Sequence, residues 1–252
     1  MKRIILTLLS LCFTVLTFAQ TNNHPTEPEM VEVKGGRFRM GCRDYEGFPW
    51  EYPVHRVTVN SFKISKYEIT QKQWVSVMGN NPSHFKGDDL PVENVSWLDV
   101  QQFILKLNEI TGKNYRLPKE AEWEYAARGG KKSKNYKYSG SNKIDEVAWY
   151  LGNSDSTTHS VGMKKPNELG IYDMCGNVAE WCDDVYEDYF GAEMTLQEAV
   201  NGLPDNEIRR VVRGSKWSSK LQFCRVSFRN QTPPECRYGL QQGTLGFRLV
   251  LP

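Results

Sequence analysis

A short segment in the last fifth of the chain concentrates the side chains that could do chemistry. Residues 213–224 read RGSKWSSKLQFC, and Arg225 follows directly. Cysteine, serine and lysine are the residue types of nucleophilic sites, and thiolates bind soft metals. A neighbouring cation lowers the pKa of a thiol and favours the reactive thiolate. Cys224, next to Arg225, is therefore the first candidate for a reactive residue.

The other cysteines allow a structural explanation of Cys224. Besides Cys12, which lies in an N-terminal apolar run, the chain contains Cys42, Cys175, Cys182, Cys224 and Cys236. An odd number of cysteines in an oxidising compartment predicts one or two disulfides and a remaining thiol. Cys182 is a candidate partner for Cys224, with Cys175 and Cys236 as alternatives. The absence of a Cys-x-x-Cys motif argues against a zinc site.

The N-terminus predicts export from the cytoplasm. Lys2 and Arg3 precede an apolar run over 4–16, and Thr17-Phe18-Ala19 fits cleavage after Ala19. We expect residues 1–19 to be a signal peptide and the mature protein to be secreted or periplasmic, since the run is too short for a transmembrane helix. Cleavage would take the formal charge from +2 to 0. A balanced charge gives no indication of nucleic acid as a partner.

The elements that would position the segment belong to one predicted domain over 29–252, after a polar lead-in over 20–28. Alternating apolar residues predict strands around Gly35-Gly36, a pair of strands within 55–70, and a strand over 245–252. Helices are expected at 70–79, from Ser96, and over 117–130. The carboxylates of the last helix are expected to be solvated. Residues 130–236 show little periodicity, so they require internal ties.

Several motifs together resemble one known family. They are GGRFRMG (35–41), RLPKEAEWEYAARGG (116–130), GNVAEW (176–181), RVVRGSKW (210–217) and LGFRLV (245–250). Their order and spacing resemble the formylglycine-generating enzyme, or sulfatase-modifying factor, family. The resemblance implies a single α+β domain with a C-type-lectin-like core and little regular secondary structure.

The same resemblance argues against the family's chemistry in this chain. Active members bind copper(I) with two cysteines five residues apart. An ungapped placement puts Ser219 and Cys224 at these positions, and a serine cannot replace a thiolate toward copper(I). A gapped placement leaves Cys224 at neither position. Lys216 replaces a motif serine, and Ala179 replaces a tryptophan. We therefore expect neither bound copper nor formylglycine formation. We expect no catalytic residue; if the chain does have one, Cys224 is the candidate.

Calcium is the metal that the residues favour. Asp173 and Glu180 flank a glycine turn in DMCGNVAEW (173–181), and hard cations prefer such oxygen-rich loops. The resemblance implies ligation by the side chains of Asp173 and Glu180 and by the main-chain oxygens of Gly176 and Val178. The alternative is that both carboxylates only accept hydrogen bonds from loop amides.

The favoured function is ligand binding by a pseudoenzyme. In the family fold the former substrate face is built from residues 214–244, where aromatic and small polar residues alternate as in recognition surfaces. The candidate ligand-contacting residues are Trp217, Ser219, Phe223, Phe228, Arg229 and Tyr238. The expected ligand is a protein or peptide, with a glycan as an alternative. Two further alternatives are a copper-dependent oxidase that matures sulfatases and a scaffold for an envelope or secretion assembly.

Overall fold

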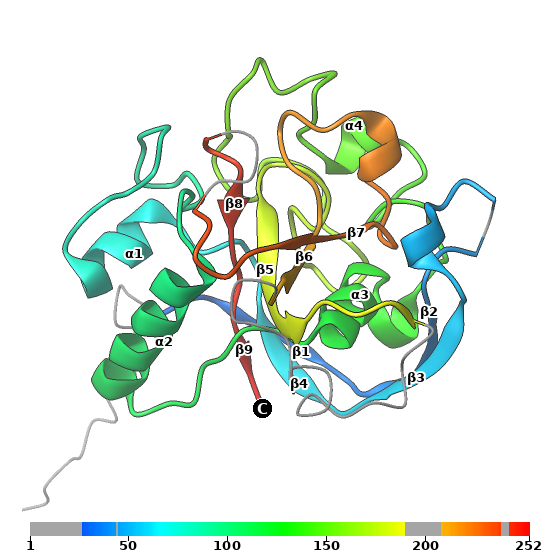
Figure 1. Cartoon of the computed structure of the whole chain (residues 1–252), viewed down its shortest axis with the longest axis horizontal. Helices are drawn as coiled ribbons and strands as arrows, with labels where there is room; N and C mark the ends of the chain where they lie inside the picture. Colours follow the sequence, from blue (N-terminus) through cyan, green and yellow to red (C-terminus); the bar gives the residue numbers. More distant parts are fainter. Residues whose placement is uncertain (1–26, 44, 190–207, 238–241) are drawn as a thin grey trace, which may run out of the picture.

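The structure is a computed structural model that describes residues 27–43, 45–189, 208–237 and 242–252 (Figure 1). Its helices are α1 (Gln71–Met78), α2 (Trp97–Thr111), α3 (Glu120–Ala127) and α4 (Ile144–Val147). Its strands are β1 (Met30–Val33), β2 (Gly36–Met40), β3 (His55–Val59), β4 (Phe62–Ser65), β5 (Ala179–Val185), β6 (Arg210–Arg213), β7 (Arg229–Thr232), β8 (Leu245–Gly246) and β9 (Val250–Leu251). The expected signal peptide lies outside the described residues.

The predicted helices at 70–79 and from Ser96 begin where their capping residues place them. The hydroxyls of Thr70 and Ser96 accept hydrogen bonds from the amides of Gln73 and Asp99, and each pair forms a capping box. Val100, Phe103, Ile104 and Leu107 are buried along one face of α2, as the stripe predicts. In Figure 1, α1 and α2 lie to the left of β8, and α3 lies to the right of β5. The mixture of separate helices and sheets confirms the expected α+β class.

The strands over 55–65 pair differently from our expectation. β3 pairs with β2 and β4 pairs with β1, both antiparallel, so the pairing expected within 55–70 is wrong. Two tight loops face each other between these pairs, where the amide of Gly35 donates to the hydroxyl of Ser61. The predicted C-terminal strand is divided into β8 and β9. β8 joins the sheet β7-β6-β5-β8, and β9 joins β1-β4-β9.

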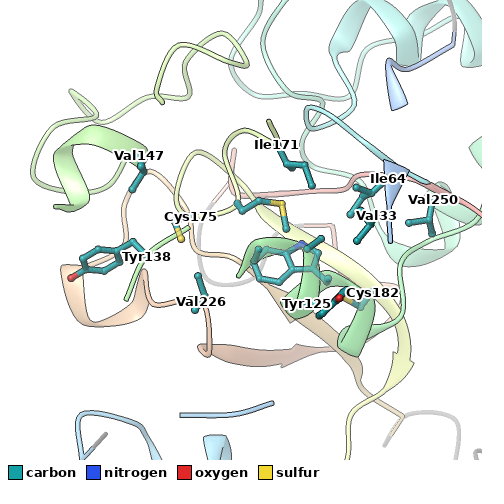
Figure 2. Packing of buried hydrophobic residues seen from close by; sticks show 14 of the residues in the cluster. Val33, Ile64, Tyr125, Tyr138, Val147, Ile171, Cys175, Cys182, Val226 and Val250 are labelled. Carbon is teal, nitrogen blue, oxygen red and sulfur yellow. The ribbon is translucent and has the colours of Figure 1, made fainter. Parts of the chain in front are cut away.

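The core has two apolar clusters. Trp181 lies in a cluster with residues of α1, α2 and β8, and Trp123 lies in the other, where α3 meets β5 and β6. Figure 2 shows the second cluster, including Cys175 and Cys182. No disulfide joins any of the five cysteines that the structure describes, so the expected bridge to Cys224 is not formed. Cys175, Cys182 and Cys224 instead pack in the second apolar cluster as small apolar groups.

The carboxylates of α3 are buried, which corrects the expectation that they are solvated. Glu120 forms a bidentate ion pair with Arg229, and Glu124 pairs with Arg128 and Arg213. Two further buried pairs are Glu51–Arg225 and Glu180–Arg248, with oxygen–nitrogen distances of 2.6 Å. We call these four sets of pairs the ion-pair framework. They tie long irregular segments to the sheets and to α3.

No helix in the described ranges is long and apolar enough to cross a membrane.

Candidate ligand-binding site

A cavity of about 390 Å³ opens on one face of the β7-β6-β5-β8 sheet. All four strands contribute to its floor, through Ala179, Val212, Asn230 and Thr232, and Leu245. Most of its wall is formed by Phe228 and by residues of the segment 213–223 other than Trp217 and Leu221. This volume falls in the range of small-ligand sites, roughly 300–1,000 Å³. The cavity is therefore large enough for a few amino-acid residues or a sugar unit.

Local turns hold the wall in place. Gly214 has a φ of 77°, which turns the chain out of β6. The hydroxyl of Ser215 then accepts the amide of Gly176, and the indole of Trp217 donates to the carbonyl of Gly243 at 2.6 Å. The amide of Lys216 donates to the hydroxyl of Ser219. Hydrogen bonds thus join the wall to neighbouring loops. The hydroxyls of Ser215 and Ser219 and the indole N–H of Trp217 are already used in these bonds.

Aromatic rings form the apolar part of the site. The rings of Phe223 and Phe228 meet edge to face at 5.2 Å, and Phe48 stacks on Phe223 at 5.4 Å. Trp50 stacks on Phe48 at 4.9 Å and is 39% exposed. These four rings continue from the cavity wall toward the surface. They provide contact area for an apolar side chain next to the polar floor.

The polar part of the site contains groups without partners. Lys216 is half-buried and forms no ion pair with any described carboxylate, and burial lowers its pKa. The hydroxyl oxygen of Ser218 is buried and has no hydrogen-bond partner. Lys220 is exposed at the cavity, and no Asp or Glu lines the cavity among the described residues. A buried polar group without a partner is costly, so these groups favour a ligand that supplies one.

The residues predicted to contact a ligand are only partly brought together. Ser219, Phe223 and Phe228 line the cavity. Trp217 is buried behind it and anchors the wall, and Arg229 is bound to Glu120 in the ion-pair framework, so neither side chain is among the lining residues. Tyr238 lies outside the described residues.

Sequence reasoning missed other lining residues. Asn230 and Thr232 point to one face of β7, which the alternation of a strand could have indicated. Phe48 and Trp50 do not line the cavity but extend its aromatic wall through Phe223, and they carry no such signal because they come from a distant part of the sequence. The position of Ala179 in the floor of the cavity likewise could not be predicted without the fold.

Cys224 has the surroundings of a structural cysteine. It is buried, and desolvation raises the pKa of its thiol to about 11. The guanidinium of Arg225, which sequence proximity suggested as an activating cation, is instead bound to both oxygens of Glu51 at 2.6 Å. No cysteine lines the cavity among the described residues. The geometry therefore offers no pair of thiolates at this site.

The predicted calcium residues lie in a buried carboxylate cluster. Glu180 pairs with Arg248 and accepts the indole N–H of Trp123, while Asp173 accepts only the amide of Gly162 through Oδ2. Asp173 Oδ1 is buried without a partner, and burial raises the pKa of this residue to about 6. Glu68, which sequence reasoning missed, lies beside both carboxylates, and its pKa is raised mainly by burial.

The negative charge of this cluster would attract a cation, but the cluster does not provide enough acidic side chains in the geometry of a metal site. Three carboxylates face one guanidinium, and one oxygen of Asp173 is unpartnered. In the described residues, no group of three or more His, Cys, Asp or Glu side chains has the geometry of a metal site. An ion bound here would therefore depend on main-chain oxygens as well as on Asp173.

Comparisons with known proteins identify the family of the chain. Residues 16–252 match the sequence profile of the "Sulfatase-modifying factor enzyme 1-like domain" family. The chain belongs to this family, which confirms the resemblance seen in the motifs.

Three related proteins show the breadth of the family. The chain is 35% identical to the "Chaperone protein LppX" of Paenibacillus barcinonensis, over 90% of this chain and 92% of that protein. It is 26% identical to the formylglycine-generating enzyme of Streptomyces coelicolor, over 86% of this chain and 87% of the enzyme. The solved structure of Treponema denticola variable protein 1 aligns with a TM-score of 0.74 at 31% identity, over 88% of this chain and 94% of that one.

Proposed function

We propose that this chain is a secreted or periplasmic binding module, without formylglycine-generating activity, that holds a segment of a protein or peptide in the cavity above the β7-β6-β5-β8 sheet. The observation that carries the proposal is the cavity lining. It combines an aromatic wall with an unpaired Lys216 and the unpartnered hydroxyl of Ser218. Such a lining offers binding groups but no thiolate pair.

The lining also suggests the chemistry of the bound segment. Lys216 and Lys220 are not opposed by any carboxylate among the described lining residues, so they favour an acidic group on the ligand. The rings of Phe223 and Phe228 favour an apolar side chain next to that group. A relative named as a chaperone supports a protein or peptide ligand over a glycan.

Ala179 provides the direct test. It lies in the cavity floor, where the family motif usually has tryptophan, so Ala179→Trp should fill the cavity while the fold accommodates the larger ring. We would measure the binding of the full chain to an array of short peptides that pair an acidic with an aromatic residue. The wild type should bind a subset of these peptides, and Ala179→Trp should bind them at least tenfold more weakly.

A matched control separates cavity filling from a general effect of tryptophan. Leu105→Trp places the same ring on an exposed position of α2 and should leave peptide binding unchanged. Equal binding by the wild type and Ala179→Trp would contradict the proposal. Binding to a glycan array that Ala179→Trp abolishes would assign the same cavity to a sugar.

The catalytic alternative has its own assay. The copper(I)-loaded protein would be incubated with a peptide containing a sulfatase Cys-x-Pro-x-Arg motif, and formylglycine would be measured by mass spectrometry. We expect none. Formylglycine that appears with the wild type and disappears with Cys224→Ser would overturn the proposal.

We also propose that a calcium ion binds at Asp173 with the main-chain oxygens of Gly176 and Val178. Glu180 would contribute through oxygens that it shares with Arg248. The unpartnered Asp173 Oδ1 supports this site, because a buried carboxylate oxygen is stabilised by a cation or a hydrogen bond. The role of the ion would be structural: it would neutralise the excess carboxylate charge beneath the cavity wall.

A further inference from the structure

A second cavity, also of about 390 Å³, lies between β2 and the end of α3. Five of its lining residues are basic, and we call it the basic basin: Arg37, Arg39, Arg43, Arg128 and Lys131. It shares no lining residue with the cavity of the proposed function. β2 contributes Arg37 and Arg39, which alternate with the inward-facing Phe38 and are exposed.

No described residue that lines the basic basin carries a negative charge to balance its cations. Among its described lining residues there is no Asp or Glu. Arg128 is bound to Glu124, but Arg43 donates to the amide oxygen of Asn135 at 2.6 Å and to the carbonyl of Arg39. Burial and the charges of Arg128 and Arg39 lower the pKa of Arg43. Guanidinium groups are therefore held close together at an electrostatic cost that a bound anion would offset.

An adjoining compartment of about 220 Å³ has a different character. It shares Arg43, Arg128 and Asn135 with the basic basin. Its other cations are already neutralised, since Lys137 pairs with Glu46 and Arg225 pairs with Glu51. Its remaining polar lining is uncharged: Tyr136, Asn142 and Ser227. The excess charge is thus concentrated in the basic basin, with Arg43 at the boundary between the two compartments, and the adjoining compartment adds uncharged hydrogen-bonding groups.

We propose that the basic basin binds a sulfate or phosphate ester of a sugar. The tetrahedral oxyanion would lie among Arg39, Arg43 and Lys131, and the hydroxyl groups of the sugar would bond to the uncharged groups of the adjoining compartment. Guanidinium groups match the paired oxygens of such esters with two parallel hydrogen bonds. A neutral sugar would leave the guanidinium charge unbalanced. This site goes beyond the proposed function, because it would act on a different face with a different ligand.

The test measures the binding of small probes to the full chain by isothermal titration calorimetry at low ionic strength. The probes are glucose 6-sulfate, glucose 6-phosphate, glucuronate and glucose. We expect one or both esters to bind, and glucuronate and glucose to bind at least tenfold more weakly. The tighter of the two esters identifies whether the natural ligand is sulfated or phosphorylated.

Two double variants with equal charge loss complete the test. Arg39→Gln with Arg43→Gln should weaken ester binding by tenfold or more, because the double variant loses charge-assisted hydrogen bonds to the oxyanion. Lys63→Gln with Lys106→Gln removes two charges from exposed positions outside both compartments and should change it less than twofold. Thermal unfolding checks that each variant folds. Absence of ester binding by the wild type, or equal losses in both double variants, would overturn the proposal.

Discussion

The ion-pair framework and the cavity lining differ in whether their charged groups have partners of opposite charge. In the framework each buried arginine is bound to a carboxylate, as in Glu51–Arg225 and Glu180–Arg248. In the cavity, the described part of the chain gives Lys216 no carboxylate partner and the hydroxyl of Ser218 no hydrogen bond. Paired charges hold the fold together, whereas unpaired ones reduce its stability and are retained where a ligand can satisfy them. The contrast makes predictions about both regions.

The largest expected effect comes from breaking the framework. Arg225→Met leaves the fully buried Glu51 without its cation, which should lower the free energy of unfolding by about 3–5 kcal/mol. Urea unfolding measures this loss. Arg237→Met is the matched control, because it breaks an exposed pair with Asp99 and should cost about 0–1 kcal/mol. Similar losses in the two variants would remove the distinction between framework and surface pairs.

Calcium should stabilise the carboxylate cluster, where the framework has too few cations. At a hundredfold excess over its dissociation constant, the ion should add about 2.7 kcal/mol to the free energy of unfolding. The measurement is thermal unfolding with added calcium and after chelation. Asp173→Asn should remove the response, and magnesium serves as the control ion. An unchanged melting temperature in calcium would rule out the site.

A smaller effect is expected at Asp184, a carboxylate at the edge of the framework. Burial raises its pKa to about 7, above the usual 3.8, and it accepts the amide of Glu120. Its contribution to stability is therefore full below about pH 4 and is lost as the pH rises through 7. Asp184→Asn keeps an acceptor oxygen without the charge. It should match the wild type at low pH and become increasingly more stable than the wild type as the pH rises through 7.

Urea unfolding at pH 5 and pH 8 tests this prediction. The exposed Asp88→Asn variant is the control for the loss of a surface carboxylate. If the excess stability of Asp184→Asn over the wild type decreases toward high pH, the fold stabilises the charged form of Asp184, and the prediction is wrong.

The smallest effect is expected in the cavity. Lys216→Met removes a half-buried cation without a partner, so it should raise the free energy of unfolding by about 0.5 kcal/mol. The same variant should weaken the binding of acidic peptides. Thermal unfolding and peptide binding measure the two effects on one protein. If Lys216→Met is less stable than the wild type and binds acidic peptides equally well, then Lys216 stabilises the fold, as the framework residues do, and does not bind the ligand.

Local features of the fold could be predicted from the sequence, and long-range pairings could not. Thr70 and Ser96 predicted the starts of α1 and α2 because a capping box needs only neighbouring residues. The alternation over 55–65 predicted strands but not their partners. The carboxylates of α3 were misjudged because Arg229 lies 109 residues from Glu120. A charged helix with distant partners looks the same in sequence as a solvated one.

The part of the candidate site that lies within the family motifs could be predicted from the sequence. The segment around Ser219 and Phe223 was expected to form a binding face, and it lines the cavity. Phe48, Trp50 and the basic basin depend on tertiary contacts between segments that no motif connects. The disulfide expectation was not met because it rested on the number of cysteines, and an apolar core accepts thiols without bonding them.

The late position of Arg248 in the sequence has a consequence for the order in which the protein folds. Arg248 supplies the cation for Glu180, and its guanidinium also bonds to the carbonyl of Ser65, 183 residues earlier. A chain that emerges from the ribosome from its N-terminus therefore cannot complete the carboxylate cluster until almost all of this domain has been synthesised. Contacts over such distances also slow folding. Newly made chains should therefore remain incompletely folded until translation of the domain is almost complete.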